Sequence, residues 1–106
     1  IRYNPNKVTK KELLEILGNE AKESTICEDN IIIDKLDINS KYFKEGYYII
    51  QDEASALVAC SIGENSEEKY KILDTCAAPG GKSLHIASKY LNSTLIHVIN
   101  IYINWL

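Results

Sequence analysis

The sequence lacks the features that mark several classes of protein. Its 106 residues include three cysteines, Cys27, Cys60 and Cys76, which form no Cys-x-x-Cys pair and leave one unmatched. This argues against both a disulfide framework and a zinc site. Neither histidine has a partner at metal-ligand spacing, so we expect no metal. The cysteine usage favours a reducing compartment, and we expect a cytoplasmic protein.

Excess positive charge and long apolar runs are also lacking. The formal net charge of -3 excludes the global basic field of a stand-alone nucleic-acid-binding protein. The most apolar segment, 95–106, is broken by polar residues and is too short to span a bilayer. No charged start followed by an apolar run indicates a signal peptide. We therefore expect no membrane association. The hydrophobic content of 45% is enough for one modest core.

Residues 1–40 predict a small α+β subdomain. Thr9 offers an N-cap hydroxyl and Glu12 completes a capping box, so a helix is expected to begin there and to end at Gly18. The stripe predicted to be buried consists of Leu13, Ile16 and Leu17. Strands are expected at 1–3 and 31–33, with 20–30 mostly loop and no secondary structure assigned to 34–44. We place the domain boundary at residue 40.

Residues 41–106 alternate strands and helices. Strands are expected at 47–50, 71–73 and 95–101, and helices at 53–62 and 82–91. Asp52 is the predicted N-cap of the first helix. In the second helix, Leu84, Ala87 and Leu91 trace one face. The last strand–helix–strand segment predicts a βαβ unit with parallel pairing, which makes the fold class α/β.

The most informative stretch runs from Ile72 to Ser83. A strand ends at Asp74, small residues and Pro-Gly-Gly follow, and a helix begins near Lys82, which is typical of a cofactor cradle. The small or absent side chains of Ala77, Ala78, Gly80 and Gly81 let the backbone approach a ligand. The start of the helix favours an anionic group, whereas Asp74 favours a cationic one. The pattern therefore indicates a zwitterionic ligand, although a purely structural glycine-rich turn is the simpler alternative.

A phosphate-binding loop is the competing interpretation. Gly81-Lys82-Ser83 matches the end of G-x-x-x-x-G-K-S, but Cys76 occupies the position of its first glycine. Pro79 also removes an amide that would surround the phosphate. The dinucleotide pattern G-x-G-x-x-G is absent, so neither alternative is favoured.

Two motifs carry a family resemblance. Asp74-Thr75-Cys76-Ala77-Ala78-Pro79-Gly80-Gly81-Lys82, preceded by Gly46-Tyr47-Tyr48-Ile49-Ile50-Gln51-Asp52-Glu53-Ala54-Ser55, closely resembles the Sun-type (Nol1/Nop2/Sun) RNA cytosine-5 methyltransferases. The start Arg2-Tyr3-Asn4 resembles the R-x-N that opens the small subdomain of that family. The resemblance covers nearly the whole chain, and the bacterial ribosomal-RNA members are the most similar.

The resemblance implies the N-terminal part of a Rossmann-like domain that binds S-adenosylmethionine. The implied cofactor residues are Cys76, Ala77, Ala78, Pro79, Gly80, Gly81 and Lys82. Asn100 stands where the family has an acid for the ribose hydroxyls. The family's nucleophile is a cysteine in a downstream P-C-S or T-C-S motif, which this sequence lacks. Thr75-Cys76 lies in the cofactor loop instead, so we expect the chain alone to be inactive.

Two further alternatives remain open. The chain could be a non-catalytic RNA-binding or interaction module on the same scaffold, or a truncation product that folds poorly. RNA, above all ribosomal RNA, is the partner implied by the resemblance. Lys7, Lys10 and Lys11 could contact RNA phosphates, but a solvated helix face explains them as well.

Overall fold

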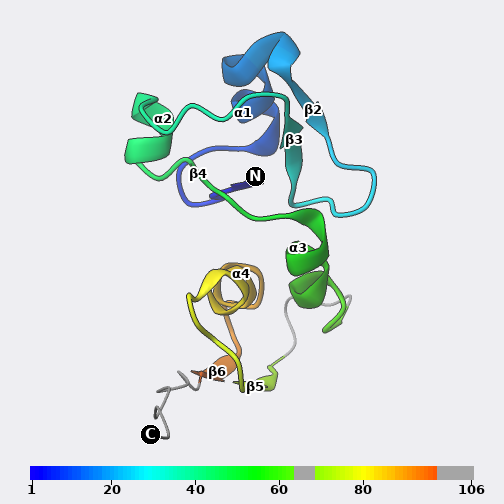
Figure 1. The fold of residues 1–106 in the computed structure, drawn as a ribbon. Coiled ribbons are helices and arrows are strands. Elements are labelled where there is room, and N and C mark those ends of the chain that lie inside the picture. Colours follow the sequence, from blue (N-terminus) through cyan, green and yellow to red (C-terminus); the bar gives the residue numbers. More distant parts are fainter. Residues whose placement is uncertain (64–68, 98–106) are drawn as a thin grey trace, which may run out of the picture. The chain divides into compact units, whose positions relative to one another are not determined.

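The computed structural model describes residues 1–63 and 69–97, with a mixed α/β fold (Figure 1). The chain divides into two compact units, Ile1–Cys60 and Ser61–Leu106. The predicted domain boundary at residue 40 stays a prediction, although a strand from beyond it pairs within the first unit. None of the helices among the described residues has the length and hydropathy needed to cross a bilayer.

Helix α1 (Lys10–Leu17) begins and ends where the sequence predicts. The Thr9 hydroxyl accepts a hydrogen bond from the Glu12 backbone N–H at 3.3 Å, and the Glu12 carboxylate accepts one from the Thr9 N–H at 2.9 Å. These bonds form the capping box. Gly18 ends the helix with φ of 64°, a left-handed conformation that favours glycine.

Two antiparallel strand pairs complete the first unit. β1 (Arg2–Tyr3) pairs with β4 (Tyr48–Ile49), and β2 (Ala21–Glu23) pairs with β3 (Ile31–Ile33). The prediction of a loop over 20–30 was wrong at β2, because this polar segment becomes a strand only by pairing with β3. The 3-10 turn η1 (Gly18–Glu20) precedes β2, and the short helix α2 (Lys41–Lys44) lies in the unassigned stretch.

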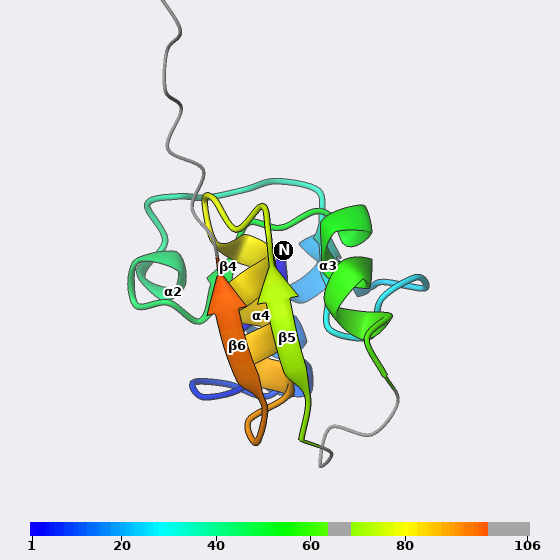
Figure 2. The same ribbon diagram turned by 90° about the horizontal axis from the view of Figure 1, so that it is seen from below.

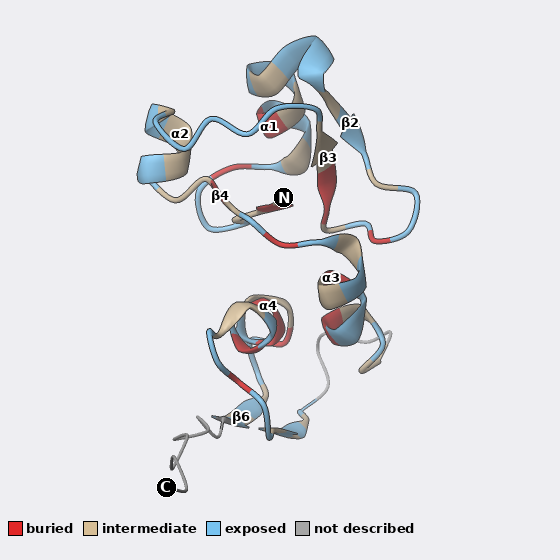
Figure 3. Cartoon of the chain, viewed as in Figure 1, coloured by how far each residue is buried: buried red, intermediate tan, exposed pale blue. Residues whose placement is uncertain are grey.

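The core of the first unit lies between α1, β3 and β4 (Figure 3). It consists of Val8, Leu13, Ile31 and Tyr48, each at most 7% exposed. Leu17 packs against this cluster. Ile16 is 38% exposed, so its predicted place in the buried stripe was wrong. A helix of two turns against short strands buries one narrow face only.

Helix α3 (Glu53–Cys60) closes the first unit in sequence. Asp52 caps it as predicted, by accepting a hydrogen bond from the Ser55 N–H at 2.9 Å. The helix ends at Cys60, before the predicted end at residue 62. Its buried residues are the small Ala56 and Ala59.

The second unit contains the predicted βαβ segment. β5 (Lys71–Asp74) and β6 (Thr94–His97) pair in parallel, and α4 (Gly81–Lys89) connects them and covers one face of the pair (Figures 1 and 2). The parallel pairing confirms the prediction. The predicted continuation of the last strand to residue 101 lies outside the described residues.

The buried face of α4 differs from the apolar stripe of the sequence. Ser83, His85 and Ile86 are buried, whereas Leu84 is 61% and Leu91 77% exposed. Tyr90 follows the helix, is 2% exposed, and donates a hydrogen bond from its hydroxyl to the Gly63 carbonyl at 2.8 Å. This face therefore buries polar and aromatic groups, and the apolar stripe is left accessible.

Candidate cofactor-binding site

The candidate site is the loop between β5 and α4. It contains small side chains at Ala77 and Ala78, then Pro79 and Gly80. Ala77 is 5% exposed and anchors the loop, whereas Ala78 and Pro79 are exposed. The loop therefore presents its backbone and short side chains on its accessible side.

Asp74, the last residue of β5, holds the two ends of the loop together. One carboxylate oxygen accepts a hydrogen bond from the Cys76 backbone N–H at 3.1 Å, and the other accepts one from the Ser83 hydroxyl at 2.5 Å. Ser83 is a buried residue of the first turn of α4. Hydrogen bonds to a carboxylate are stronger than those between neutral groups. Asp74 thus shapes the loop, besides placing a negative charge at its edge.

Gly80 is the N-cap of α4 and adopts φ of 105°, which side chains other than hydrogen rarely permit. Within residues 1–63 and 69–97, no side-chain hydrogen bond caps this helix end. The first intrahelical bond runs from the Leu84 N–H to the Gly80 carbonyl at 2.9 Å. The N–H groups of the first turn carry the positive end of the helix dipole.

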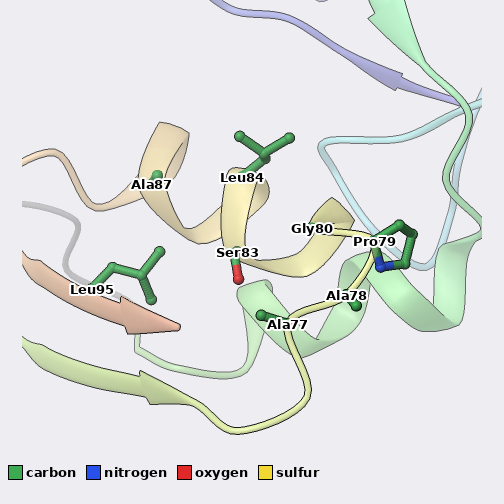
Figure 4. Close-up of a pocket in the computed structure, with 8 residues that line it drawn as sticks. All are labelled: Ala77, Ala78, Pro79, Gly80, Ser83, Leu84, Ala87 and Leu95. Atoms are coloured by element: carbon green, nitrogen blue, oxygen red, sulfur yellow. The ribbon is translucent and has the colours of Figure 1, made fainter. Parts of the chain in front are cut away.

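A pocket of about 530 Å³ lies between the loop and α4 (Figure 4). Its lining is mostly apolar and consists of Ala77, Ala78, Pro79, Gly80, Ser83, Leu84, Ala87 and Leu95. Figure 4 shows Leu95, from β6, and the loop residues on opposite sides, with Ser83 between them. This size and this lining suit a small organic ligand with a few polar groups.

The structure brings four of the predicted cofactor residues to the pocket, namely Ala77, Ala78, Pro79 and Gly80. Cys76 and Lys82 are exposed, and Gly81 is the first residue of α4. Asn100 lies outside the described residues. The assignment of all eight residues as cofactor ligands stays a prediction.

Four lining residues were not in the predicted set: Ser83, Leu84, Ala87 and Leu95. Leu84 and Ala87 belong to the apolar stripe of α4, which helical spacing alone cannot distinguish from a core-facing stripe. The sequence offers a signal that could have placed Ser83 at the site, because Ser83 directly follows Gly81-Lys82, one turn after the loop.

Comparisons with known proteins agree with the two motifs. The chain is 36% identical over 106 residues to the probable ribosomal RNA small subunit methyltransferase B of Bacillus subtilis, a match covering 96% of this chain and 23% of that protein. The corresponding methyltransferase of Pseudomonas syringae is 38% identical over 77 residues, covering 71% of this chain and 17% of that protein. The chain belongs to the Sun-type (Nol1/Nop2/Sun) family.

A eukaryotic protein and a solved structure extend this comparison. The Sun-type chain is 35% identical over 108 residues to the 25S rRNA (cytosine-C(5))-methyltransferase rcm1 of Schizosaccharomyces pombe, covering 88% of this chain and 23% of that protein. The crystal structure of PH0851 matches with a TM-score of 0.72 and 28% identity, over 91% of this chain and 23% of that one. No family model matches the chain. The chain therefore spans about a quarter of the length of these relatives, or less.

Proposed function

We propose that this chain binds S-adenosylmethionine and forms the cofactor-binding part of a ribosomal RNA cytosine-5 methyltransferase. The observation that carries the proposal is the pocket beside the carboxyl end of β5, lined by the loop that resembles the family's cofactor motif. The relatives named as ribosomal RNA methyltransferases support the reaction class. RNA as substrate and a cytoplasmic location belong to the same proposal.

The residues at the pocket fit the proposed cofactor. A Cβ atom at Gly80 would lie 3.9 Å from the Ala77 carbonyl oxygen, so the strain of the left-handed backbone, more than lack of space, requires glycine there. The uncapped start of α4 suits the cofactor's carboxylate, and the Asp74 carboxylate suits its ammonium group. Apolar side chains at Leu84 and Leu95 would cover the less polar part.

A Rossmann-like sheet is the second part of the proposal. α4 covers one face of the β5–β6 pair, on which Ile72 and Leu95 are half-buried. On the other face, Leu73 and Ile96 are paired in register and are 61% and 59% exposed. Strands that are apolar on both faces are typical of parallel sheets covered by helices on both sides. We infer that these two strands belong to a larger sheet of that kind.

The roles within the reaction follow from this placement. The cofactor would supply an electrophilic methyl group when bound. The chain's own residues would bind and orient the cofactor, through the α4 N-terminus and the loop fixed by Asp74. Cys76 lies in this loop, and we assign it to cofactor binding and not to attack on cytosine. We therefore propose that the 106-residue chain alone transfers no methyl group.

Calorimetric titration with S-adenosylmethionine tests the cofactor assignment. Gly80→Val should weaken binding about tenfold or more, because a left-handed conformation costs a substituted residue about 1–2 kcal/mol or more and would displace the loop. Gly18→Val is a matched control, since Gly18 is also left-handed but ends α1 in the other unit. Equal affinity in the wild-type chain and Gly80→Val would refute the loop assignment.

A methyl-transfer assay with unmodified ribosomal RNA tests the rest of the proposal separately. The chain should bind cofactor without turnover. Turnover by the chain alone would show that its nucleophile lies within these residues, and RNA binding without any cofactor binding would favour a non-catalytic module instead.

A further inference from the structure

A second group of chemically reactive side chains lies in the first unit, on residues far apart in the sequence. Cys27 and Cys60 bring their sulfur atoms to 3.1 Å, and the Cys60 thiol lies 3.6 Å from an Asp29 carboxylate oxygen. One ligand atom from each of the three residues lies within 4.8 Å of the other two. We propose that Cys27, Asp29 and Cys60 form a binding site for a thiophilic divalent cation, with Zn²⁺ as the best match.

The loop that carries two of these residues is held in place by hydrogen bonds. The Ser24 hydroxyl oxygen accepts hydrogen bonds from the N–H groups of Ile26 and Cys27, at 3.1 and 3.0 Å. The Asn30 N–H in turn donates to the Cys27 carbonyl at 3.0 Å. Cys27 and Asp29 are therefore positioned by the backbone of a closed turn between β2 and β3.

The same loop is joined to the segment that carries the third residue. The Ser24 hydroxyl donates a hydrogen bond to the Glu53 carboxylate at the start of α3, whose last residue is Cys60. The Asn30 side-chain amide donates to the Gln51 carbonyl at 3.1 Å. These two connections fix the loop against α3, so the three donor atoms converge before any ion arrives. Preorganised ligands lose little conformational freedom on binding.

The donor set has the chemistry of a zinc site. Two thiolates and one carboxylate are all common zinc ligands, and three protein ligands leave the fourth tetrahedral position to water. Cys27 is 2% exposed, whereas Cys60 and Asp29 are half-buried, which gives an ion a route from solvent. Binding replaces the two thiol protons by bonds to the metal and releases both protons to solvent.

Arg2 is a buried cation whose charge interacts with Asp29 and Cys27. Burial lowers the pKa of the Arg2 guanidinium, and the charges of Asp29 and Cys27 oppose this lowering in part. Two thiolates and a carboxylate around a divalent cation carry one net negative charge. The Arg2 guanidinium, whose Nε donates a hydrogen bond to Gln51 Oε1 at 2.7 Å, does not compete for the ion, because it has no lone pair to donate.

Asp29 decides between a metal site and a redox-active disulfide. Asp29 places a carboxylate oxygen 3.6 Å from the Cys60 thiol, where it supplies a third ligand and a negative charge that attracts a cation, whereas a disulfide needs only the two sulfur atoms. Sulfur atoms bound to one tetrahedral zinc ion at about 2.3 Å lie roughly 3.8 Å apart, so the two sulfur atoms, now 3.1 Å apart, need to separate by about 0.7 Å to accommodate the ion. The geometry together with the third ligand therefore favours the metal.

Titration of the reduced 106-residue chain with Co²⁺ and Zn²⁺ tests this site. One equivalent of Co²⁺ should release about two protons and give a thiolate-to-cobalt charge-transfer band in the near ultraviolet. Zn²⁺ added afterwards should displace the Co²⁺ and abolish the band without further proton release. Cys60→Ser and Asp29→Asn should each weaken Zn²⁺ binding by about tenfold or more. Cys76→Ser is the matched control, because this exposed thiol lies in the other unit, and it should bind as the wild type does.

Each other outcome contradicts the proposal. No charge-transfer band, or a band that Cys76→Ser also loses, would exclude this site. A chain two mass units lighter after treatment with oxidised glutathione, with no metal affinity in its reduced form, would show a disulfide pair instead. Circular dichroism of Cys60→Ser and Asp29→Asn separates loss of binding from loss of folding, and because both positions are half-buried we expect both variants to fold.

Discussion

At the scale of single residues, Asp74 determines the geometry of the candidate site. Its two oxygens bind the Cys76 backbone and the Ser83 hydroxyl, so one carboxylate fixes both the exit from β5 and the first turn of α4. Asp74 therefore influences ligand binding through the shape of the loop, even if the loop backbone and not its own carboxylate contacts the ligand. From the sequence we predicted only that Asp74 would attract a cationic group of the ligand, and not that it would hold the loop together.

Removing the Ser83 hydroxyl should weaken S-adenosylmethionine binding. Ser83→Ala deletes a hydrogen bond to a carboxylate, an interaction of about 1.5–3 kcal/mol, part of which holds the loop in its binding geometry. We expect calorimetry to show an affinity lower by about tenfold. Ser88→Ala is a control on the same helix, because the Ser88 hydroxyl donates to the His85 carbonyl and not to the loop. Equal losses in both variants would point to a general effect on α4.

The capping box of α1 should make stability depend on pH. Hydrogen bonds from Thr9 hold the pKa of Glu12 below its usual value, so its contribution is fully present above the unfolded pKa of about 4.3. That contribution is lost as the pH falls through the folded pKa. Thr9→Ala should therefore cost about 1 kcal/mol in urea unfolding at pH 7 and less at pH 3.

Ser40→Ala supplies the comparison for this measurement. The Ser40 hydroxyl caps α2 by accepting from the Tyr42 N–H at 3.2 Å, a bond between two uncharged groups. Its cost should be the same at both pH values. A Thr9→Ala cost that does not change with pH would mean that Glu12 contributes nothing through its charge.

At the scale of elements, the sequence predicted the structures that depend on neighbouring residues, and it did not predict those that depend on contacts between distant residues. The α1 cap, the Gly18 end and the parallel β5–β6 pairing depend on neighbouring residues or on a short connection, and the sequence predicts them. β2 was missed because its strand conformation depends on β3. The Cys27–Cys60 contact joins residues 33 apart, which no spacing rule for adjacent cysteines detects.

Helix α4 illustrates why periodicity alone did not identify a buried face. The apolar spacing of Leu84, Ala87 and Leu91 is real, but in the structure this stripe is exposed and partly lines the pocket. The opposite face buries His85 and Ile86. Helical spacing reports that residues share a face, and it does not report what covers that face.

Substitutions on the two faces of α4 should separate these roles. Ile86→Ala should cost about 2–4 kcal/mol of unfolding free energy, because Ile86 is 4% exposed and its removal leaves a cavity. Leu84→Ala should change stability by less than about 0.5 kcal/mol, since it is 61% exposed, yet weaken cofactor binding. Denaturant unfolding and calorimetry of the same samples make the comparison. A stability loss for Leu84→Ala equal to that for Ile86→Ala would mean that the apolar stripe with Leu84 is buried, contrary to the structure.

At the scale of the whole molecule, the open face of the β5–β6 pair should govern association. Leu73 and Ile96 lie side by side in register and are largely exposed, as are Leu84 and Leu91 on α4. Exposed apolar groups on a two-stranded sheet favour contact with a second molecule. We expect the chain to self-associate with rising concentration in sedimentation velocity experiments.

Charge on that face should oppose the association. Leu73→Lys combined with Ile96→Lys should shift the chain towards monomer, because burying two ammonium groups is costly. Leu36→Lys combined with Ile38→Lys is the matched control, since these exposed apolar residues lie in the other unit. Equal association in both double variants and in the wild type would mean that the β5–β6 face does not mediate the association. A wild-type chain that stays monomeric at every concentration would remove the main physical support for a larger sheet, because an apolar face that is stable in water requires no second layer of helices.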